Sequence, residues 1–214
     1  MSGNTGPRSA YSTEAELVRF GKPERAERAD AARNRARVLD AARALFRAHG
    51  VDSVTMDQVA AAAGVGKGTL FRRFGDKAGL AVALLDARER DLQTAILSGP
   101  PPLGPGAAPA DRLVAFLAAY VDFLDENLDL VHLSETARPG ARYDIGAYRL
   151  WHRHVAVLID QADPDLDADY LAHALLAPLA ADQRMALHED IGPARVRAGL
   201  ATLARSILTN GSAT

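Results

Sequence analysis

The chain has 214 residues, with 25 Lys and Arg against 27 Asp and Glu, 48% hydrophobic residues and no Cys. This length and apolar fraction exclude a wholly disordered chain and suit one large domain or two small ones. Because cysteine is absent, disulfides, thiolate zinc sites, iron–sulfur clusters and cysteine nucleophiles are excluded as well. No apolar run approaches membrane-spanning length and no signal-peptide pattern is present, so we expect a cytoplasmic protein with no membrane partner.

The charge divides unevenly along the chain. Residues 22–90 carry fourteen basic and nine acidic side chains, a balance of +5, whereas residues 91–214 carry nine basic and sixteen acidic ones, a balance of −7. Binding to nucleic acid requires a basic surface, so the first segment is the one suited to such a partner. Surface charge also fluctuates along any chain, and a motif is needed to support this interpretation.

The N-terminal part begins without clear periodicity. Residues 1–29 are rich in Ser, Thr, Gly and charged side chains, which predicts a flexible arm that is briefly helical around Glu14 to Phe20. From Asp30 onward, apolar residues recur at helical spacing as far as His49, where a glycine follows as a helix stop. This pattern predicts the first helix of a domain that spans residues 30–97.

Two short helices follow within this domain. Thr55 and Gln58 match a capping box, in which the Thr55 hydroxyl accepts from the Gln58 backbone N–H and the Gln58 side chain reaches back. The helix that starts at about Met56 ends at Gly64, a residue suited to the left-handed conformation. Helical spacing resumes after a glycine-containing turn. The pattern predicts a helix-turn-helix over residues 55–74, whose second helix would enter the major groove of double-stranded DNA.

The candidate DNA contacts lie in and around the second helix of this motif. In a helix-turn-helix the first half of that helix faces the base edges, and flanking groups set the register through phosphate contacts. A glycine near the leading edge allows close approach of the backbone, while hydroxyl and basic side chains supply donors. The predicted DNA-binding residues are Thr55, Lys67, Gly68, Thr69, Leu70, Phe71, Arg72, Arg73 and Lys77.

Five arginines gather between residues 25 and 37, upstream of the motif. Arms of this kind add minor-groove or phosphate contacts in other DNA-binding domains. A solvated, charged lead-in to the first helix explains them equally well. The sequence leaves both interpretations open for Arg25, Arg28, Arg33, Arg35 and Arg37.

The rest of the chain is also helical in pattern. A fourth helix is predicted over 77–97 with Asp76 as its cap, and a Pro- and Gly-rich linker or long loop follows at 98–109. In the second domain, residues 110–214, the spacing predicts helices at 113–124, 128–136, 145–159, 170–188 with a bend at Pro178, and 193–209. No segment shows the alternation typical of a strand. We therefore expect an all-α fold with about nine helices.

The stretch from Val38 to Leu85 resembles the DNA-binding domain of the tetracycline-repressor (TetR) family of bacterial transcription regulators. The resemblance implies an all-α homodimer, usually a repressor, whose C-terminal domain binds a small molecule that lowers the affinity for DNA. The matching features occur in order and without a gap: the apolar pattern that ends at His49-Gly50, then Thr55, Val59-Ala60, Ala63-Gly64-Val65, Lys67-Gly68-Thr69-Leu70, Phe74, Lys77 and Leu80.

Three positions depart from the family pattern. Gly66 stands where Ser is frequent, which removes a cap or phosphate donor at the start of the recognition helix. Phe71 stands where Tyr is common, so a phenolic hydroxyl is missing. Arg73 stands where His is common, and its guanidinium can keep a phosphate contact with permanent charge.

The resemblance also implies an effector cavity between helices of the second domain, where most of its aromatic side chains gather. For any single one of these residues core packing is the more frequent role. The effector is an unknown small molecule, and the sequence leaves its charge open. The candidate pocket residues are Phe116, Tyr120, Phe123, His132, Tyr148, Trp151, His152, Val155 and Met185.

By the same resemblance, the last two helices, at about 170–188 and 193–209, form the homodimer interface as a four-helix bundle. A two-fold dimer would place its recognition helices roughly 34 Å, or a multiple of it, apart, which predicts a palindromic operator.

No catalytic motif occurs, and we expect neither an enzyme nor a cofactor. His152 and His154 are two residues apart on a helix and point to different faces, so we expect no metal site there. The acidic run from Asp163 to Asp169 lacks the glycine and the twelfth-position Glu of a calcium loop.

The function expected from these features is that of a repressor released from a palindromic operator by a small-molecule effector. One alternative is a regulator without an effector, which acts constitutively or as an activator. Another is a helical ligand-binding protein whose DNA-binding head is vestigial.

Overall fold

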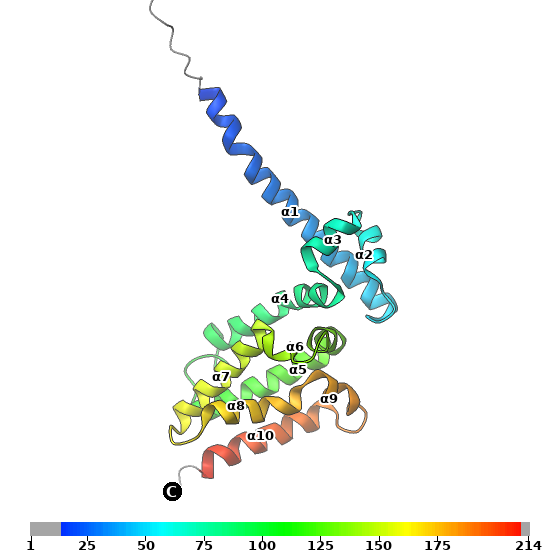
Figure 1. The fold of residues 1–214 in the computed structure, drawn as a ribbon. Coiled ribbons are helices and arrows are strands. Elements are labelled where there is room, and N and C mark those ends of the chain that lie inside the picture. The colour runs from blue at the N-terminus through cyan, green and yellow to red at the C-terminus, as the bar shows by residue number, and fades with distance from the viewer. Residues whose placement is uncertain (1–13, 211–214) are drawn as a thin grey trace, which may run out of the picture.

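The computed structural model describes residues 14–210, with side chains from residue 28 to residue 209. Within these residues every regular element is a helix, which confirms the all-α fold class (Figure 1). The elements are α1 (Glu14–His49), α2 (Met56–Ala63), α3 (Lys67–Phe74), α4 (Lys77–Ser98), α5 (Pro109–Glu135), α6 (Ala141–Asp144), α7 (Gly146–Ala162), α8 (Ala168–Leu176), the 3-10 turn η1 (Ala177–Leu179), α9 (Ala181–Ala186) and α10 (Pro193–Asn210).

The helix α1 begins well before the predicted first helix. Residues 14–29 belong to it, so the expectation of a flexible arm is wrong for that stretch, and residues 1–13 lie outside the described residues. Residues 24–37 consist mainly of Ala, Arg and Glu, which favour helix without needing an apolar face. The early turns of α1 extend away from the other helices (Figure 1). A helix that makes no contact with the others needs no apolar periodicity, so the pattern did not indicate this part of α1.

A first hydrophobic cluster joins the second half of α1 to α2, α3 and the start of α4. Helices of eight residues, such as α2 and α3, are not stable alone and depend on this packing. The buried members of the cluster are Val38, Ala42, Phe46, Val51, Val54, Met56, Val59, Ala60, Ala63, Leu70, Phe74, Leu80 and Leu84.

A second cluster joins the rest of α4 to α5, α7, α8 and α10. It begins at Leu85, directly after Leu84 of the first cluster, so the two cores meet inside α4. The Pro- and Gly-rich segment at 98–109 is consequently not a linker between domains. It is a tight loop between the paired helices α4 and α5, closed by the N–H of Gly104 on the carbonyl oxygen of Pro100 at 2.9 Å.

The second domain differs from the sequence prediction at two helices. The predicted helices 113–124 and 128–136 are one helix, α5, bent at Asn127 (φ −129°, ψ 20°), whose side chain donates to the Phe123 carbonyl oxygen. The predicted helix 170–188 is broken rather than bent at Pro178. Because proline lacks an N–H and Ala180 is extended (φ −64°, ψ 134°), the chain forms α8, η1 and α9 in succession.

Candidate DNA-binding interface

The turn between α2 and α3 is shaped by two glycines. Gly64 adopts the left-handed conformation (φ 64°, ψ 37°) and its N–H reaches the carbonyl oxygens of Ala60 and Ala61, which ends α2. A Cβ would strain the backbone at this angle. Gly66 is extended and begins α3 without a side-chain cap. The structure therefore contains the helix-turn-helix that the sequence predicts over residues 55–74.

The start of α2 has the predicted capping box. The N–H of Gln58 donates to Thr55 Oγ1 at 3.3 Å, and Gln58 Oε1 accepts from the Thr55 N–H at 2.8 Å. The Thr55 hydroxyl also donates to Gln58 Oε1 at 3.1 Å. The Thr55 side chain is exposed, but its hydrogen-bonding capacity is used within the cap.

The recognition helix α3 has one buried face. Leu70 is 1% exposed and Phe74 is buried, and both belong to the first hydrophobic cluster. Their spacing of four residues places them on the same side of the helix. The prediction that Leu70 contacts DNA is therefore wrong, because its side chain fills the core beneath the helix.

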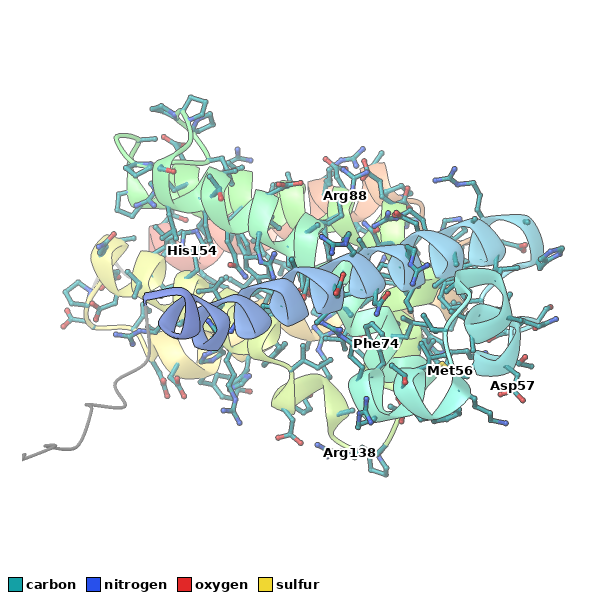
Figure 2. The ribbon with its side chains drawn as sticks, turned by 90° about the horizontal axis from the view of Figure 1, so that it is seen from above. Met56, Asp57, Phe74, Arg88, Arg138 and His154 are labelled. Carbon is teal, nitrogen blue, oxygen red and sulfur yellow. The ribbon has the colours of Figure 1, made fainter. Side chains whose placement is uncertain are left out.

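The opposite face of α3 is exposed and basic. Lys67, Gly68, Thr69, Phe71, Arg72 and Arg73 are all exposed. Lys67 Nζ lies 2.7 Å from Asp57 Oδ2 on α2 and 5.8 Å from the centre of the Phe71 ring. Sequence reasoning did not identify Asp57, which lies at the outer edge of the domain in Figure 2. Both members of the ion pair are largely exposed, so the pair contributes about 1 kcal/mol at most.

Two of the predicted DNA-binding cations serve the fold. Arg73 Nη1 donates to the Ala31 carbonyl oxygen at 2.8 Å and so ties the end of α3 to α1. Lys77 Nζ donates to the carbonyl oxygens of Val51, Asp52 and Val54 at 2.9, 3.2 and 3.3 Å. Lys77 thus holds the loop before α2 in place.

Arg72 differs from these neighbours. Its side chain is exposed, and among the described residues it forms no ion pair or side-chain hydrogen bond. Arg72 follows Leu70 by two residues, which turns it away from the core. It is therefore the cation of α3 that is most accessible to a phosphate.

The upstream arginines divide between several roles. Arg35 Nη2 lies 2.9 Å from Asp86 Oδ2 on α4, and its guanidinium lies 5.8 Å from the Phe74 ring centre. Arg33 pairs with Asp30 and Arg37 donates to Asn34, all on α1. The Arg25 side chain lies outside the described ones. Arg35 is consequently a link between α1 and α4.

In the second domain the structure brings together the predicted aromatic residues of α5 and α7. The ring centres of Phe116 and Tyr120 each lie 5.8 Å from that of Trp151, and Tyr120 stacks on Phe123 at 5.9 Å. Phe116, Tyr120, Trp151 and Val155 are buried in the second cluster. The side chains predicted to line a pocket between α5 and α7 pack against one another and fill the space between these helices.

A small cavity remains beside this aromatic cluster. Its volume is about 20 Å³, enough for one water molecule, and Tyr148 and Trp151 are among its lining residues. Glu89 and Arg142 also reach it. Burial raises the pKa of Glu89 to about 7, with a further contribution from the carboxylate of Asp86.

Two of the predicted pocket residues, His132 and Met185, lie elsewhere, whereas the ring centre of His152 is 6.3 Å from that of Tyr148. His152 contacts His173 on α8, at a ring-centre distance of 3.9 Å. Met185 lines a separate cleft, and His132 lines neither that cleft nor the small cavity. Met185 lies apart from the aromatic cluster because it is on α9, beyond the break at η1.

The separate cleft lies between the two domains and has a volume of about 930 Å³. One wall carries arginines of α1 and α4, and Arg88 marks it in Figure 2. The other wall carries acidic residues around the bend of α5 and after α9. These charged lining residues are Arg43, Arg47 and Arg88 on the basic side and Asp125, Glu126, Asp129, Glu189 and Asp190 on the acidic side.

A buried ion pair that sequence reasoning missed stands next to the small cavity. Arg142 Nη1 lies 2.6 Å from Glu135 Oε1, and Arg142 also donates to the carbonyl oxygens of Leu176 and Leu179. Glu135 Oε2 accepts from the Ala181 N–H at 2.9 Å. The pair therefore fixes the break between α8 and α9 against α5 and α6.

Among residues 14–210, no helix combines the length and apolarity needed to cross a bilayer.

Comparisons of sequence support the helix-turn-helix. Residues 38–84 match the family described as bacterial regulatory proteins, tetR family. An HTH-type transcriptional regulator of Staphylococcus aureus (strain bovine RF122 / ET3-1) is 41% identical over 69 residues, which are 32% of this chain and 36% of that protein. Another, of S. aureus strain USA300, is 40% identical over 65 residues, 30% of this chain and 34% of that protein. The chain spans about a third of the length of these curated relatives.

Solved structures share the fold over most of the chain. A TetR-family transcriptional regulator from Streptomyces coelicolor matches with a TM-score of 0.57 and 24% identity, over 85% of this chain and 97% of that one. The TetR-family repressor FadR of Thermus thermophilus, solved with lauroyl-CoA, matches with a TM-score of 0.58 and 20% identity, over 83% and 94%. At these identities the comparison shows the fold. Residues 38–84 are therefore similar to the DNA-binding domain of the tetR family, and the chain as a whole shares the fold of solved TetR-family regulators.

Proposed function

We propose that this protein is a DNA-binding transcriptional regulator, a homodimeric repressor that a small-molecule effector releases from a palindromic operator. The observation that carries the proposal is the exposed basic face of α3, opposite Leu70 and Phe74. A recognition helix needs one face buried for stability and the other free for the major groove. The α3 helix satisfies both requirements within eight residues.

The first half of α3 supplies the groups that read bases. Gly68 presents no side chain and allows close approach, and Thr69 offers a hydroxyl and a methyl group to base edges. Lys67 leaves its weak, exposed pair with Asp57 for a DNA acceptor. Arg72 supplies a phosphate contact that fixes the register. Thr55, Arg73 and Lys77 contribute by holding α2 and α3 at the required angle.

The dimer forms through the outer faces of α8 and α10. Both faces carry exposed large apolar side chains, Tyr170 at 68% and Leu203 at 53% exposure. Beside Leu203, α10 exposes Ala198 and Gly199, whose small size permits two helices to approach closely. A two-fold axis here makes a four-helix bundle and presents two α3 helices to successive major grooves.

The effector binds in the second domain between α5 and α7, at the small cavity beside Trp151. Because that cavity holds only about one water, a ligand selects an arrangement in which these helices have moved apart. The helix α4 contributes to both hydrophobic clusters, so such a movement changes the position of α3. A repressor of the same fold has been solved in complex with lauroyl-CoA, which supports the proposal of a small-molecule effector.

The test is a fluorescence-anisotropy titration of the full chain with the DNA immediately upstream of its own gene, at several salt concentrations. Arg72→Ala is expected to weaken binding and to lower the slope of log K against log salt by about 1, since one phosphate contact is lost. Arg153→Ala, which removes an exposed arginine of α7, is the matched control and should bind as the wild type does.

Two outcomes would overturn the proposal. One is equal affinity for this DNA and for a scrambled duplex of the same length and composition. The other is a monomer at micromolar concentration in analytical ultracentrifugation, which would exclude the dimer and the palindromic operator.

A further inference from the structure

Three metal-ligating side chains meet at the surface between α7 and α8. One ligand atom from each of His152, Asp169 and His173 lies within 4.8 Å of the other two. Asp169 and His173 are four residues apart on α8 and so share a face, while His152 approaches from α7. The two imidazole rings are 3.9 Å apart, and His152 Nε2 lies 3.7 Å from Asp169 Oδ1.

We propose that these three residues bind one divalent transition-metal ion of the Zn²⁺, Co²⁺ and Ni²⁺ class. Two imidazole nitrogens and one carboxylate oxygen form a donor set that suits these ions, whereas Mg²⁺ and Ca²⁺ prefer oxygen alone. Donor atoms of a tetrahedral zinc site lie about 2.0–2.2 Å from the metal, so small side-chain rotations bring this set into range. A fourth position stays open to solvent, because Asp169 and His173 are exposed.

A hydrogen bond behind the site orients one of the ligands. Tyr148 Oη lies 2.7 Å from His173 Nδ1, in the arrangement that commonly holds a metal-binding histidine from its far side. When Nδ1–H donates to Tyr148, the lone pair of His173 is on Nε2, which is free for the ion. Tyr148 is itself buried and has the Arg142 guanidinium 5.0 Å from its ring centre, so its position is well defined.

The His152 contact must change for the ion to bind. In the described structure His152 Nε2 lies 3.1 Å from the backbone carbonyl oxygen of Asp169. A metal would replace this bond and connect α7 to α8 directly. His152 follows Trp151, the only tryptophan of the chain, so the connection is made next to the aromatic cluster.

The sequence analysis identified no metal-binding partner for His152. The spacing excluded His154, and the histidine that the structure places beside His152 is His173, 21 residues further on across the turn between α7 and α8. The site is separate from α3, so metal binding does not depend on the proposed DNA-binding function.

The experiment is a calorimetric titration of the untagged, chelator-treated full chain with ZnCl₂, repeated with CoCl₂ while the visible absorption of bound Co²⁺ is recorded. We expect one ion per chain. His173→Ala and His152→Ala should each weaken binding at least tenfold, and Tyr148→Phe by about tenfold or more, in line with the effect of losing an outer hydrogen bond. His49→Ala, which removes an exposed histidine of α1, should bind as the wild type does.

Two results would overturn the site: no saturable binding of one ion per chain, or undiminished binding by both His173→Ala and His152→Ala with native helicity in circular dichroism. As a second measurement, Zn²⁺ should raise the Tm of the wild type and of His49→Ala but not of His173→Ala. None of these measurements involves DNA, so their failure would leave the regulator proposal intact, and failure of DNA binding would leave the metal site intact.

Discussion

Lys77 Nζ lies 2.9 Å from the carbonyl oxygen of Val51, 26 residues earlier in the chain. The same ammonium also reaches the carbonyl oxygens of Asp52 and Val54, directly before the Thr55 cap. The first residue of α4 therefore fixes the loop from which α2 starts. This contact gives Lys77 a role in positioning the helix-turn-helix, and the phosphate contact expected from the sequence stays a prediction.

Lys77→Met should lower the free energy of unfolding by about 1.5–3 kcal/mol, the usual range for hydrogen bonds to a charged group. Urea denaturation measures this loss. DNA affinity should also fall, but the slope of log K against log salt should stay unchanged because no phosphate contact is removed. A slope reduced by one, with wild-type stability, would instead assign Lys77 to a phosphate.

Thr55→Ala should destabilise the protein by about 1 kcal/mol, since it removes the acceptor for the Gln58 N–H at the start of α2. Thr55→Ser keeps the hydroxyl and should stay close to the wild type. The urea midpoints of the two variants provide the comparison. Equal midpoints would show that the capping box contributes nothing to stability.

Glu135→Gln should lower the free energy of unfolding by about 3–5 kcal/mol, because it leaves the buried Arg142 guanidinium without a neutralising partner. Arg138→Ala is the control. Its ion pair with Asp144 is exposed, and Arg138 lies at the edge of the molecule in Figure 2, so its loss should cost about 1 kcal/mol or less. Amide exchange at Ala181 should accelerate in Glu135→Gln alone, as Glu135 accepts from that N–H.

Glu89 should make stability depend on pH. Burial raises its pKa from 4.5 to about 7, so the folded state binds a proton more tightly than the unfolded state. The stabilising contribution is complete below pH 4.5 and is lost as the pH rises through 7. Glu89→Gln should remove this fall, so the stability of the variant relative to the wild type should increase between pH 4.5 and 7.5. Thermal unfolding across that range tests the prediction.

His154 changes the pH dependence of stability in the opposite direction, so its effect must be measured separately from that of Glu89. Burial and the nearby Arg112 lower its pKa from 6.5 to about 4, so its contribution is present above pH 6.5 and is lost as the pH falls through 4. His154→Phe keeps a ring against Phe116 and should remove this loss at low pH. Relative to the wild type, the stability of the two variants should change with pH in opposite directions. If both changed in the same direction, at least one of the two pKa shifts would be wrongly assigned.

Much of the local structure was predictable because it follows from neighbouring residues. The Thr55 and Gln58 cap, the left-handed Gly64 and the Asp76 cap of α4 all depend on residues within three or four positions. Contacts between segments that are distant in the sequence were not predictable in this way. The four-residue spacing of Leu70 and Phe74 does indicate a shared face, but the pairing of His152 with His173 leaves no signal in the spacing of nearby residues. The break at Pro178 was predicted only as a bend. The loss of one hydrogen bond at a proline is compatible with either a kinked or a broken helix, and the local sequence does not distinguish the two.

The meeting of the two cores at Leu84 and Leu85 has a consequence for how the molecule comes apart. Leu84 and Leu85 are adjacent residues of one helix and are buried in different lobes, so a continuous helical backbone joins the lobes beside the cleft that Leu84 lines. Heat should therefore melt both lobes in a single cooperative transition. A substitution that disrupts packing at Leu84 or Leu85 should therefore destabilise both lobes and not only the lobe that contains it.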